Sequence, residues 1–476
     1  MKKILYIASE AMPFASTGGL ADVIGSLPID VAKSGADVRV VMPLHGSISN
    51  KYREMMTTEA EFYVNLSWRK QYCGVKSLEW KGVKFYFIDN EYYFARDRLY
   101  ANYDDGERFA FFSLAAIDML GVIGYYPDVI NANDWQSALA VIYLERKYRQ
   151  IQGYENIRTV FSIHNIEYQG KYDMAILGDV FSLEARDRHI VEYDGCINLM
   201  KGAIVCADRV VTVSPRYSGE ICTPEYGSGL ENVLIENRNK LLGILNGIDY
   251  DYYNPQTDTE INKNYTWRSV ARKLENKLAL QKELGLEERM DVPMISIISR
   301  LVSHKGIDLV SKMVYNLLDN NDVQLVVLGC GDYEYERFFI ELANNFKGRV
   351  AALIKYDRDT SKRIYSASDI FLMPSKSEPC GLSQMIASRY GAIPVVRETG
   401  GLYDSIKGFW IDGDTLCGNG FTFANYSSDE LYERTCAAIN LWNDAALRAE
   451  FVSKIMRVDF SWKTSAKKYL TLYETL

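Results

Sequence analysis

The segment with the most chemical content is Ser-Glu-Pro-Cys-Gly-Leu-Ser-Gln at residues 377–384. It follows the apolar run 370–374, and Glu378 stands directly before a proline that stiffens the turn. A carboxylate held there can bind sugar hydroxyl groups or support positive charge that develops at an anomeric carbon. Gly381 can bring backbone amides near a bound sugar. The alternative interpretation is a helix N-terminal cap that binds no ligand.

Two basic residues follow another apolar run, at residues 294–299. Arg300 and Lys305 lie in the loop between this run and a predicted helix that begins at Lys305-Gly306. Arginine offers a planar fork and lysine a point charge, so the pair can hold a diphosphate. An ordinary solvated loop is the alternative.

Two glycine turns repeat one pattern, strand then glycines then helix. In Ser-Thr-Gly-Gly-Leu at 16–20, Gly18 and Gly19 let backbone N–H groups approach an anion, and the helix dipole supports it. Thr399-Gly400-Gly401 repeats the idea near the end of the chain, where a phosphate can rest on a helix N-terminus. A tight turn without a ligand explains the first of these segments equally well.

Further polar residues follow predicted strands, and other chemistries lack their residues. His164 and Asn165 follow the run 159–163, and Asn246 lies near the crossover between the two halves of the chain. A lone histidine such as His164 is more often structural than catalytic. The four histidines form no H-E-x-x-H and no cluster with cysteine, which argues against zinc. No P-loop and no G-x-S-x-G motif is present.

The elements that position these loops alternate between strands and helices. Apolar runs predict strands, with a first helix at 20–31, and the runs lie at 3–8, 38–42, 84–88, 129–132, 159–164, 209–213, 294–299, 325–328, 350–354, 370–374 and 393–396. Short continuous apolar strands between helices predict parallel sheets covered on both faces. Such sheets bind ligands at the carboxyl ends of their strands, where the residues above lie.

Length and composition predict a globular protein of two or three domains. The chain has 476 residues, 48% of them hydrophobic and 24% charged. Asn254-Pro255 and the polar stretch 256–265 break the pattern and predict an interdomain linker close by. A net charge of −8 argues against nucleic-acid binding. Eight scattered cysteines, a short N-terminal apolar run and no membrane-length apolar stretch predict a cytoplasmic protein away from membranes.

Taken together, the ordered motifs resemble the family of bacterial glycogen synthases and plant starch synthases. The blocks that carry this resemblance are 4–28, 108–112, 162–165, 211–215, 246–249, 299–306, 328–332, 378–384, 399–402 and 459–462. The resemblance implies an α/β protein of the GT-B type, with two Rossmann-like domains facing across a deep cleft. It implies an acceptor-side domain over 1–245, a donor domain over 246–456 and a C-terminal helix, 457–476, returning to the first domain.

The family's activity gives each motif an expected role. The resemblance implies a retaining hexosyltransferase that moves glucose from ADP-glucose to the non-reducing 4-hydroxyl of an α-1,4-glucan. The implied catalytic residues are Arg300, Lys305, Glu378 and His164. The implied donor-binding residues are Ser16, Gly18, Gly19, Asn246, Tyr356, Cys380, Gly381, Leu382, Thr399, Gly400 and Gly401. The implied acceptor-binding residues are Asp22, Tyr100, Asp134, Trp135 and Asn165.

The resemblance also implies what the reaction does without. We expect no cofactor and no metal, because Arg300 and Lys305 can neutralise the departing diphosphate. The expected partners are ADP-glucose and glycogen or a maltooligosaccharide, with no nucleic acid and no membrane. The sequence gives no indication of an oligomeric state.

The chain departs from the family pattern at three places. Ser16 stands where the family's K-x-G-G-L motif has lysine, and Asn133-Asp134-Trp135-Gln136 stands where H-D-W-H is common. Ile386, eight residues after Glu378, replaces the second glutamate of the wider superfamily. Three interpretations follow: an ADP-glucose-dependent glucan synthase, a related retaining enzyme with another donor such as UDP-glucose, or a non-catalytic glucan-binding paralogue.

Overall fold

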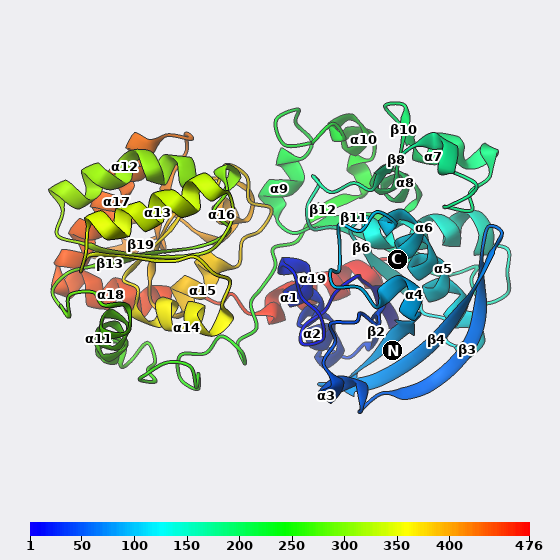
Figure 1. Ribbon diagram of the computed structural model, residues 1–476, viewed down its shortest axis with the longest axis horizontal. Coiled ribbons are helices and arrows are strands. Elements are labelled where there is room, and N and C mark those ends of the chain that lie inside the picture. Colours follow the sequence, from blue (N-terminus) through cyan, green and yellow to red (C-terminus); the bar gives the residue numbers. More distant parts are fainter. The chain divides into compact units, whose positions relative to one another are not determined.

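The computed structural model describes all residues, 1–476, and divides them into two compact units. Unit 1 comprises Met1–Gly247 and Trp462–Leu476, and unit 2 comprises Ile248–Ser461. The boundaries predicted from the sequence stand at 245/246 and 456/457. Each unit contains one large β-sheet flanked by helices (Figure 1). No helix combines the length and the apolar character that crossing a bilayer requires.

The sheet of unit 1 has nine strands in the order β12-β11-β7-β6-β1-β2-β5-β4-β3. Their bounds are β1 Lys3–Ile7, β2 Asp37–Pro43, β3 Thr57–Leu66, β4 Arg69–Trp80, β5 Val83–Asp89, β6 Val129–Asn133, β7 Arg158–Ile163, β11 Arg209–Thr212 and β12 Leu241–Gly243. The six apolar runs predicted in this part of the chain are all strands. The expectation of a purely parallel sheet is wrong, because β4 runs antiparallel to both β3 and β5.

The helix predicted over residues 20–31 is two helices. α1 spans Gly19–Ile24 and α2 spans Leu27–Lys33, with Gly25 and Ser26 between them. Pro28 explains the restart, because a proline fits the first turn of a new helix, where no backbone donor is needed, and not the interior of a continuous one.

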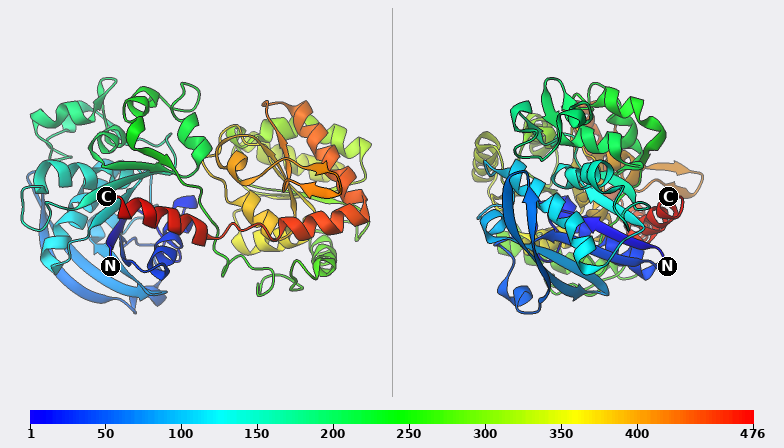
Figure 2. Two further views of the ribbon diagram at one scale, coloured as in Figure 1. Left: turned by 180° about the vertical axis from the view of Figure 1, so that it is seen from behind. Right: turned by 90° about the vertical axis from the view of Figure 1, so that its right-hand side faces the viewer.

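The C-terminal helix α19, Trp462–Glu474, completes the core of unit 1. It packs against α2, and Figure 2 shows it in red beside the dark-blue N-terminal helices. The Tyr473 hydroxyl lies 2.8 Å from the Tyr6 hydroxyl on β1, and Asn131 Nδ2 donates to it at 2.7 Å. These buried polar contacts fix α19 on the strands whose carboxyl ends carry the candidate site.

The remaining helices of unit 1 connect and cover these strands. They are α3 Asn50–Arg53, α4 Glu91–Phe94, α5 Asp105–Ile123, α6 Ala138–Tyr143, α7 Arg188–Val191, α8 Leu199–Cys206, α9 Pro215–Glu220 and α10 Glu231–Glu236. α5 is almost wholly buried, as its phenylalanine-rich sequence leads one to expect.

The sheet of unit 2 is fully parallel, with the order β15-β14-β13-β16-β17-β20. The strands are β13 Met294–Ile298, β14 Gln324–Leu328, β15 Val350–Leu353, β16 Ile370–Met373, β17 Ile393–Arg397 and β20 Phe421–Phe423. This is the doubly wound order, in which the order of the strands along the sheet reverses between β13 and β16 while all strands stay parallel. The loops after β13 and β16 therefore flank the crevice where such sheets bind ligands.

Helices cover both faces of this sheet, as right-handed crossovers require. α12, Ile307–Asn320, and α13, Tyr333–Asn345, lie on one side, and α11, Lys273–Leu284, and α14, Arg358–Ala367, lie on the other (Figure 1). The other helices of the unit are α15 Ser383–Arg389, α16 Gly400–Ser405, α17 Ser428–Asn443 and α18 Ala445–Ile455.

The polar stretch 254–265, close to which a linker is predicted, is part of unit 2. Asp258 is buried, lies 3.3 Å from Lys362 Nζ and accepts a hydrogen bond from the Tyr390 hydroxyl. The Tyr265 hydroxyl is also buried and donates to the Tyr390 carbonyl at 2.8 Å. The stretch packs into unit 2 because polar residues that find buried partners pack as firmly as apolar ones. The division between the units lies shortly before it, at Gly247 and Ile248.

Candidate active site

In unit 2, two of the predicted catalytic side chains form an ion pair in which Glu378 is buried and Lys305 is half-buried. Lys305 Nζ lies 2.7 Å from Glu378 Oε2, and the Ser375 hydroxyl donates to the same oxygen at 3.1 Å. Glu378 is only 6% exposed, so its charge depends on these two donors. Lys305 and Glu378 are 73 positions apart in the sequence and come together because they follow neighbouring parallel strands, β13 and β16.

A glycine brings the two loops together. After the short helical turn Ser303–Lys305, Gly306 has φ 77°, a left-handed conformation that side chains disfavour. A Cβ atom at Gly306 would lie 2.1 Å from the Pro374 carbonyl oxygen, so any other residue would push the loops apart. The close approach places Lys305 next to Glu378.

The second glycine turn packs against the loop that carries Glu378. A Cβ atom added at Gly400 would lie 1.9 Å from the Glu378 carbonyl oxygen. One added at Gly401 would lie 2.1 Å from the Cys380 carbonyl oxygen. The Gly401 amide donates to the Glu378 and Pro379 carbonyls, each at 3.2 Å. The structure thus gives these glycines a packing role, which the sequence analysis did not foresee. Donor binding by Thr399, Gly400 and Gly401 stays a prediction.

Gln384 holds the same loop from inside and was missed as a functional residue. Its Nε2 donates to the carbonyls of Cys380 at 3.2 Å and Gly381 at 2.9 Å, and to the Ser405 hydroxyl at 3.0 Å. The signal was available, because Gln384 ends the conspicuous segment 377–384. Its side chain fixes the backbone around Gly381 and Leu382 before any ligand binds.

Arg300 differs from Lys305 because no carboxylate neutralises it. Its side chain is exposed, and its guanidinium lies 3.4 Å from His304 Nε2. With Arg300, Lys305 and Glu378 all ionised, the cluster carries one net positive charge and can attract an anion. Tyr356, in the loop after β15, is 74% exposed, so its ring is available for stacking.

In unit 1, the structure brings Asp134, His164 and Asn165 together at the carboxyl ends of β6 and β7. Asp134 Oδ1 accepts from the His164 backbone amide at 2.7 Å. Asp134 has φ 56°, an unfavourable value for aspartate that is typical of functional sites. Burial raises the pKa of the Asp134 carboxyl to about 7.

His164 is a neutral imidazole whose tautomer is fixed by Asn133. Burial lowers its pKa to about 4. Asn133 Nδ2 donates to the Ile7 and Asn131 carbonyls, so its Oδ1 faces His164 and accepts from Nε2–H at 2.9 Å. Nδ1 of His164 is then an acceptor. Asn133, noted from the sequence only as a replaced histidine, orients this ring.

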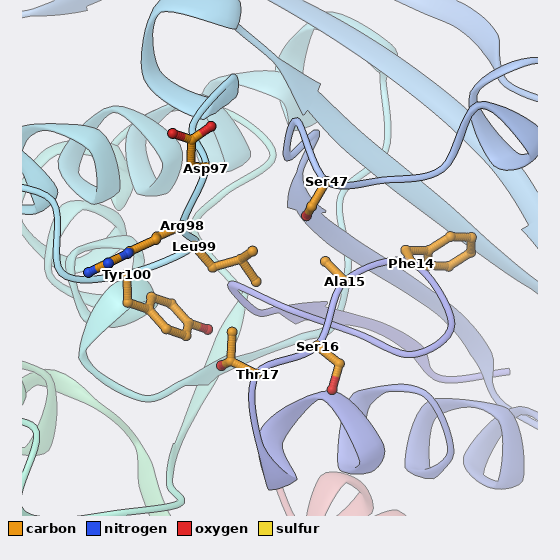
Figure 3. Close-up of a pocket in the computed structure, with 9 residues that line it drawn as sticks. All are labelled: Phe14, Ala15, Ser16, Thr17, Ser47, Asp97, Arg98, Leu99 and Tyr100. Carbon is orange, nitrogen blue, oxygen red and sulfur yellow. The ribbon is translucent and has the colours of Figure 1, made fainter. Parts of the chain in front are cut away.

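A cavity of about 570 Å³ lies beside the Ser16 loop (Figure 3). Its lining residues come from two loops and Ser47, and are Phe14, Ala15, Ser16, Thr17, Ser47, Asp97, Arg98, Leu99 and Tyr100. The predicted donor residue Ser16 and the predicted acceptor residue Tyr100 thus line one cavity. An added Cβ at Gly18 or Gly19 would meet nothing within 4 Å, so the space beside both is open to a ligand.

The other predicted residues of unit 1 lie around this region. Asp22 is in the first turn of α1. The Tyr100 hydroxyl lies 2.7 Å from the Ser9 hydroxyl, and the Trp135 ring lies 5.3 Å from that of Phe109. Asn246 is 6% exposed, and its buried Oδ1 has no hydrogen-bond partner in the protein. An unsatisfied buried acceptor calls for an explanation such as a ligand or water.

Glu10 is a second residue that the sequence analysis missed. It follows β1, is 2% exposed, and its Oε2 accepts from the Thr17 amide at 2.6 Å and the Thr17 hydroxyl at 2.8 Å. Burial raises the pKa of this carboxyl to about 7. The rule that ligand-site residues follow parallel strands would have found it, since Glu10 comes three residues after Ile7.

Comparisons with known proteins cover the whole chain. The sequence matches "Starch synthase catalytic domain" over residues 3–236 and "Glycosyl transferases group 1" over residues 282–453. Similar proteins include a glycogen synthase of Geobacillus thermodenitrificans, 43% identical over all of this chain and 98% of that protein. Another is a glycogen synthase of Clostridium botulinum, 45% identical over all of this chain and 99% of that protein.

Two solved structures resemble this one. The catalytic domain of starch synthase IV from Arabidopsis thaliana, bound to ADP and acarbose, superposes with a TM-score of 0.91 at 34% identity. The alignment covers 100% of this chain and 99% of that one. Sucrose-phosphate synthase from Thermosynechococcus elongatus, at 17% identity and a TM-score of 0.62, shares the fold.

Proposed function

Because the chain belongs to the family of bacterial glycogen synthases and plant starch synthases, we propose that its donor is ADP-glucose and its acceptor the non-reducing 4-hydroxyl of an α-1,4-glucan. The protein is a glucan-synthesising glycosyltransferase with the GT-B fold, as predicted. Family membership implies a nucleotide-sugar donor and a glucan acceptor. The buried Lys305–Glu378 pair, with the uncompensated Arg300 in the same loop, is the observation that carries the residue roles.

In this proposal unit 2 binds the donor. Arg300 and Lys305 neutralise the diphosphate, whose negative charge rises as the bond to glucose breaks. Glu378 accepts hydrogen bonds from hydroxyl groups of the transferred glucose, and the backbone of residues 380–382 also holds this glucose. Tyr356 stacks on the nucleobase. The starch synthase IV structure was obtained with ADP, which supports ADP as the leaving nucleotide here.

The residues of unit 1 then orient the sugars. His164, neutral and fixed by Asn133, offers Nδ1 as a hydrogen-bond acceptor, and Asp134 and Trp135 contact the glucan. In the retaining step the bond from C1 to the phosphate oxygen breaks, and the bond from C1 to the acceptor O4 forms on the same face. The 4-hydroxyl proton passes to the departing phosphate, so no protein nucleophile and no metal is assigned a role.

One observation supports a second candidate function, that of a related retaining glycosyltransferase that uses UDP-glucose as its donor. Ser16 supplies no charge where the family motif has lysine, so the donor loop can have been rebuilt for another nucleotide sugar. A non-catalytic glucan-binding paralogue is disfavoured, because binding a glucan requires no diphosphate-neutralising residues such as Arg300 and Lys305.

A direct assay tests the proposal. Purified protein, glycogen primer and radiolabelled ADP-glucose or UDP-glucose are incubated, and label in precipitated polymer is counted. We expect incorporation from ADP-glucose to exceed that from UDP-glucose by at least about tenfold. Preference for UDP-glucose would establish the second candidate, and no incorporation from either donor, in protein with native melting behaviour, would favour the paralogue.

Ser16→Lys should raise kcat/KM for ADP-glucose. A charge-assisted hydrogen bond contributes about 1.5–3 kcal/mol, against about 0.5–1.5 for a neutral one, so the expected gain is about tenfold. Ser16 is exposed beside the open cavity, which has room for the longer side chain. Ser47→Lys, which adds the same charge at another wall of the cavity, is the matched control. An unchanged or lower value for Ser16→Lys contradicts the prediction.

A further inference from the structure

The loop at residues 16–19 of unit 1 has few hydrogen bonds of its own. Ser16, Thr17, Gly18 and Gly19 are all exposed. The Thr17 amide and hydroxyl both donate to Glu10 Oε2, at 2.6 and 2.8 Å, and the Gly18 carbonyl accepts from Ala21. Thr17 is therefore the residue through which this stretch is fixed to the sheet, and Glu10 accepts from both its amide and its hydroxyl.

The opposite wall of the cavity is fixed at the neighbouring residue. Tyr100 Oη lies 2.7 Å from Ser9 Oγ, and Ser9 and Glu10 are consecutive residues at the end of β1. Figure 3 shows the side chains of Thr17 and Tyr100 next to each other, and Ser16 farther from Tyr100, on the loop that carries Thr17. Both walls of the cavity are thus attached to the carboxyl end of one central strand.

A carboxylate is a costly choice for this attachment. Glu10 is 2% exposed and has no lysine, arginine or histidine among its partners. An ionised group buried without a cation is unfavourable, so this acceptor lowers the stability of the fold. Unfavourable local choices of this kind are concentrated at functional sites, where a fixed geometry matters more than stability.

We propose that Glu10 is a positioning residue, which holds Ser16, Gly18 and Gly19 through Thr17 in the conformation that receives the substrate. The inference rests on the proposed function, because the substrate of that loop is the one proposed above. Glu10 itself need not touch the substrate. It acts by keeping the exposed loop in one conformation before the substrate binds. The free-energy cost of ordering the loop then does not reduce the affinity for the substrate.

Unit 1 contains a matched control with nearly the same geometry elsewhere. Asp208 Oδ2 accepts from the Thr159 amide at 2.8 Å and from the Thr159 hydroxyl at 3.0 Å. This pair lies at the amino-terminal ends of β7 and β11, whereas the candidate site lies at the carboxyl ends of the strands. Asp208 also pairs with Arg158 at 3.1 Å, so it has the cation that Glu10 lacks. Thr159→Val removes the same kind of hydrogen bond without touching the substrate loop.

The test compares Glu10→Ala and Thr17→Val with Glu10→Gln, Thr17→Ser and the control Thr159→Val. Three quantities are measured: kcat and KM for ADP-glucose, the melting temperature, and hydrogen exchange of peptides covering residues 14–20. In Glu10→Ala and Thr17→Val we expect kcat/KM to fall at least about tenfold, with exchange of these peptides at least about tenfold faster. Glu10→Gln and Thr17→Ser, which keep the acceptor or the hydroxyl, should stay within about threefold of wild type. Thr159→Val should lower the melting temperature and leave kcat/KM unchanged.

Other outcomes overturn the inference. If folded Glu10→Ala keeps kcat/KM within threefold, or if Thr159→Val loses as much, Glu10 has only a structural role. If kcat/KM falls while exchange of residues 14–20 is unchanged, Glu10 acts on the substrate directly and not through the loop. Wild-type protein that is inactive with every donor would refute the proposed function instead. The exchange measurement would then still decide whether Glu10 fixes the loop.

Discussion

Lys305→Ala should lower kcat at least about a hundredfold. Removing one preorganised charge that stabilises a transition state typically costs about 2.7–4 kcal/mol, which corresponds to a factor of about 10² to 10³. The ammonium of Lys305 is preorganised by its 2.7 Å contact with Glu378, so no reorganisation is needed when the diphosphate becomes more negative. Calorimetry should show weaker binding of ADP and unchanged binding of a maltooligosaccharide.

The same substitution should also destabilise unit 2, for a separate reason. It leaves the Glu378 carboxylate buried with Ser375 as its remaining side-chain donor, and breaking a buried pair in this way costs about 3–5 kcal/mol. In the double variant Lys305→Ala/Glu378→Gln no buried charge is left, so the stability should return while ADP binding stays weak. This separates the charge on the donor from the charge on Glu378.

Lys312→Ala is the control for Lys305. Lys312 lies on α12 in the same unit, its side chain is 65% exposed, and it approaches Asp308 only at 4.0 Å. Both activity and stability should be unchanged, because an exposed pair of this kind contributes little. Wild-type affinity for ADP in Lys305→Ala would contradict the diphosphate assignment, whatever happens to the melting temperature.

The sequence predicted well what apolar patterning determines. Continuous runs such as residues 129–132 and 294–299 became central parallel strands, because both faces of such strands are buried. The hairpin of β3 and β4 escaped prediction because its side chains are mostly exposed on one face and carry charges, as in Thr-Thr-Glu-Ala-Glu-Phe. Its turn at Ser67, and the turn at Lys81-Gly82 that joins β4 to β5, take positive φ values that no apolar pattern reveals.

The candidate site was predictable as a set of loops and not as a set of contacts. Placing Arg300, Lys305 and Glu378 after strands followed from the strand pattern. That Lys305 meets Glu378 depends on which strands are neighbours, and on how closely Gly306 lets two backbones approach. Glu10 and Asn133 were missed for a related reason. Each acts through a residue brought near by the fold, Thr17 and His164, and a single sequence does not specify such pairs.

Arg300→Ala should lower kcat as much as Lys305→Ala does, at least about a hundredfold, but without loss of stability. The guanidinium of Arg300 is exposed and has no carboxylate partner, so its removal leaves no buried charge behind. The cluster of Arg300, Lys305 and Glu378 would then carry no net charge, and a departing diphosphate would have little to attract it. Unchanged melting with a large loss of kcat is the expected combination, and it distinguishes Arg300 from Lys305.

Arg300→Lys separates charge from shape. Lysine keeps the positive charge but cannot hold two phosphate oxygens in the planar fork of a guanidinium, so kcat should fall between the wild-type and Arg300→Ala values. Arg337→Ala on α13 is the control, since that side chain is 66% exposed and forms its ion pair with Glu341 one turn away. If Arg300→Ala retained kcat within threefold of wild type, the charge acting on the diphosphate would have to come from Lys305 alone. Because Glu378 already offsets the charge of Lys305, this result would instead place the diphosphate at the glycine turns.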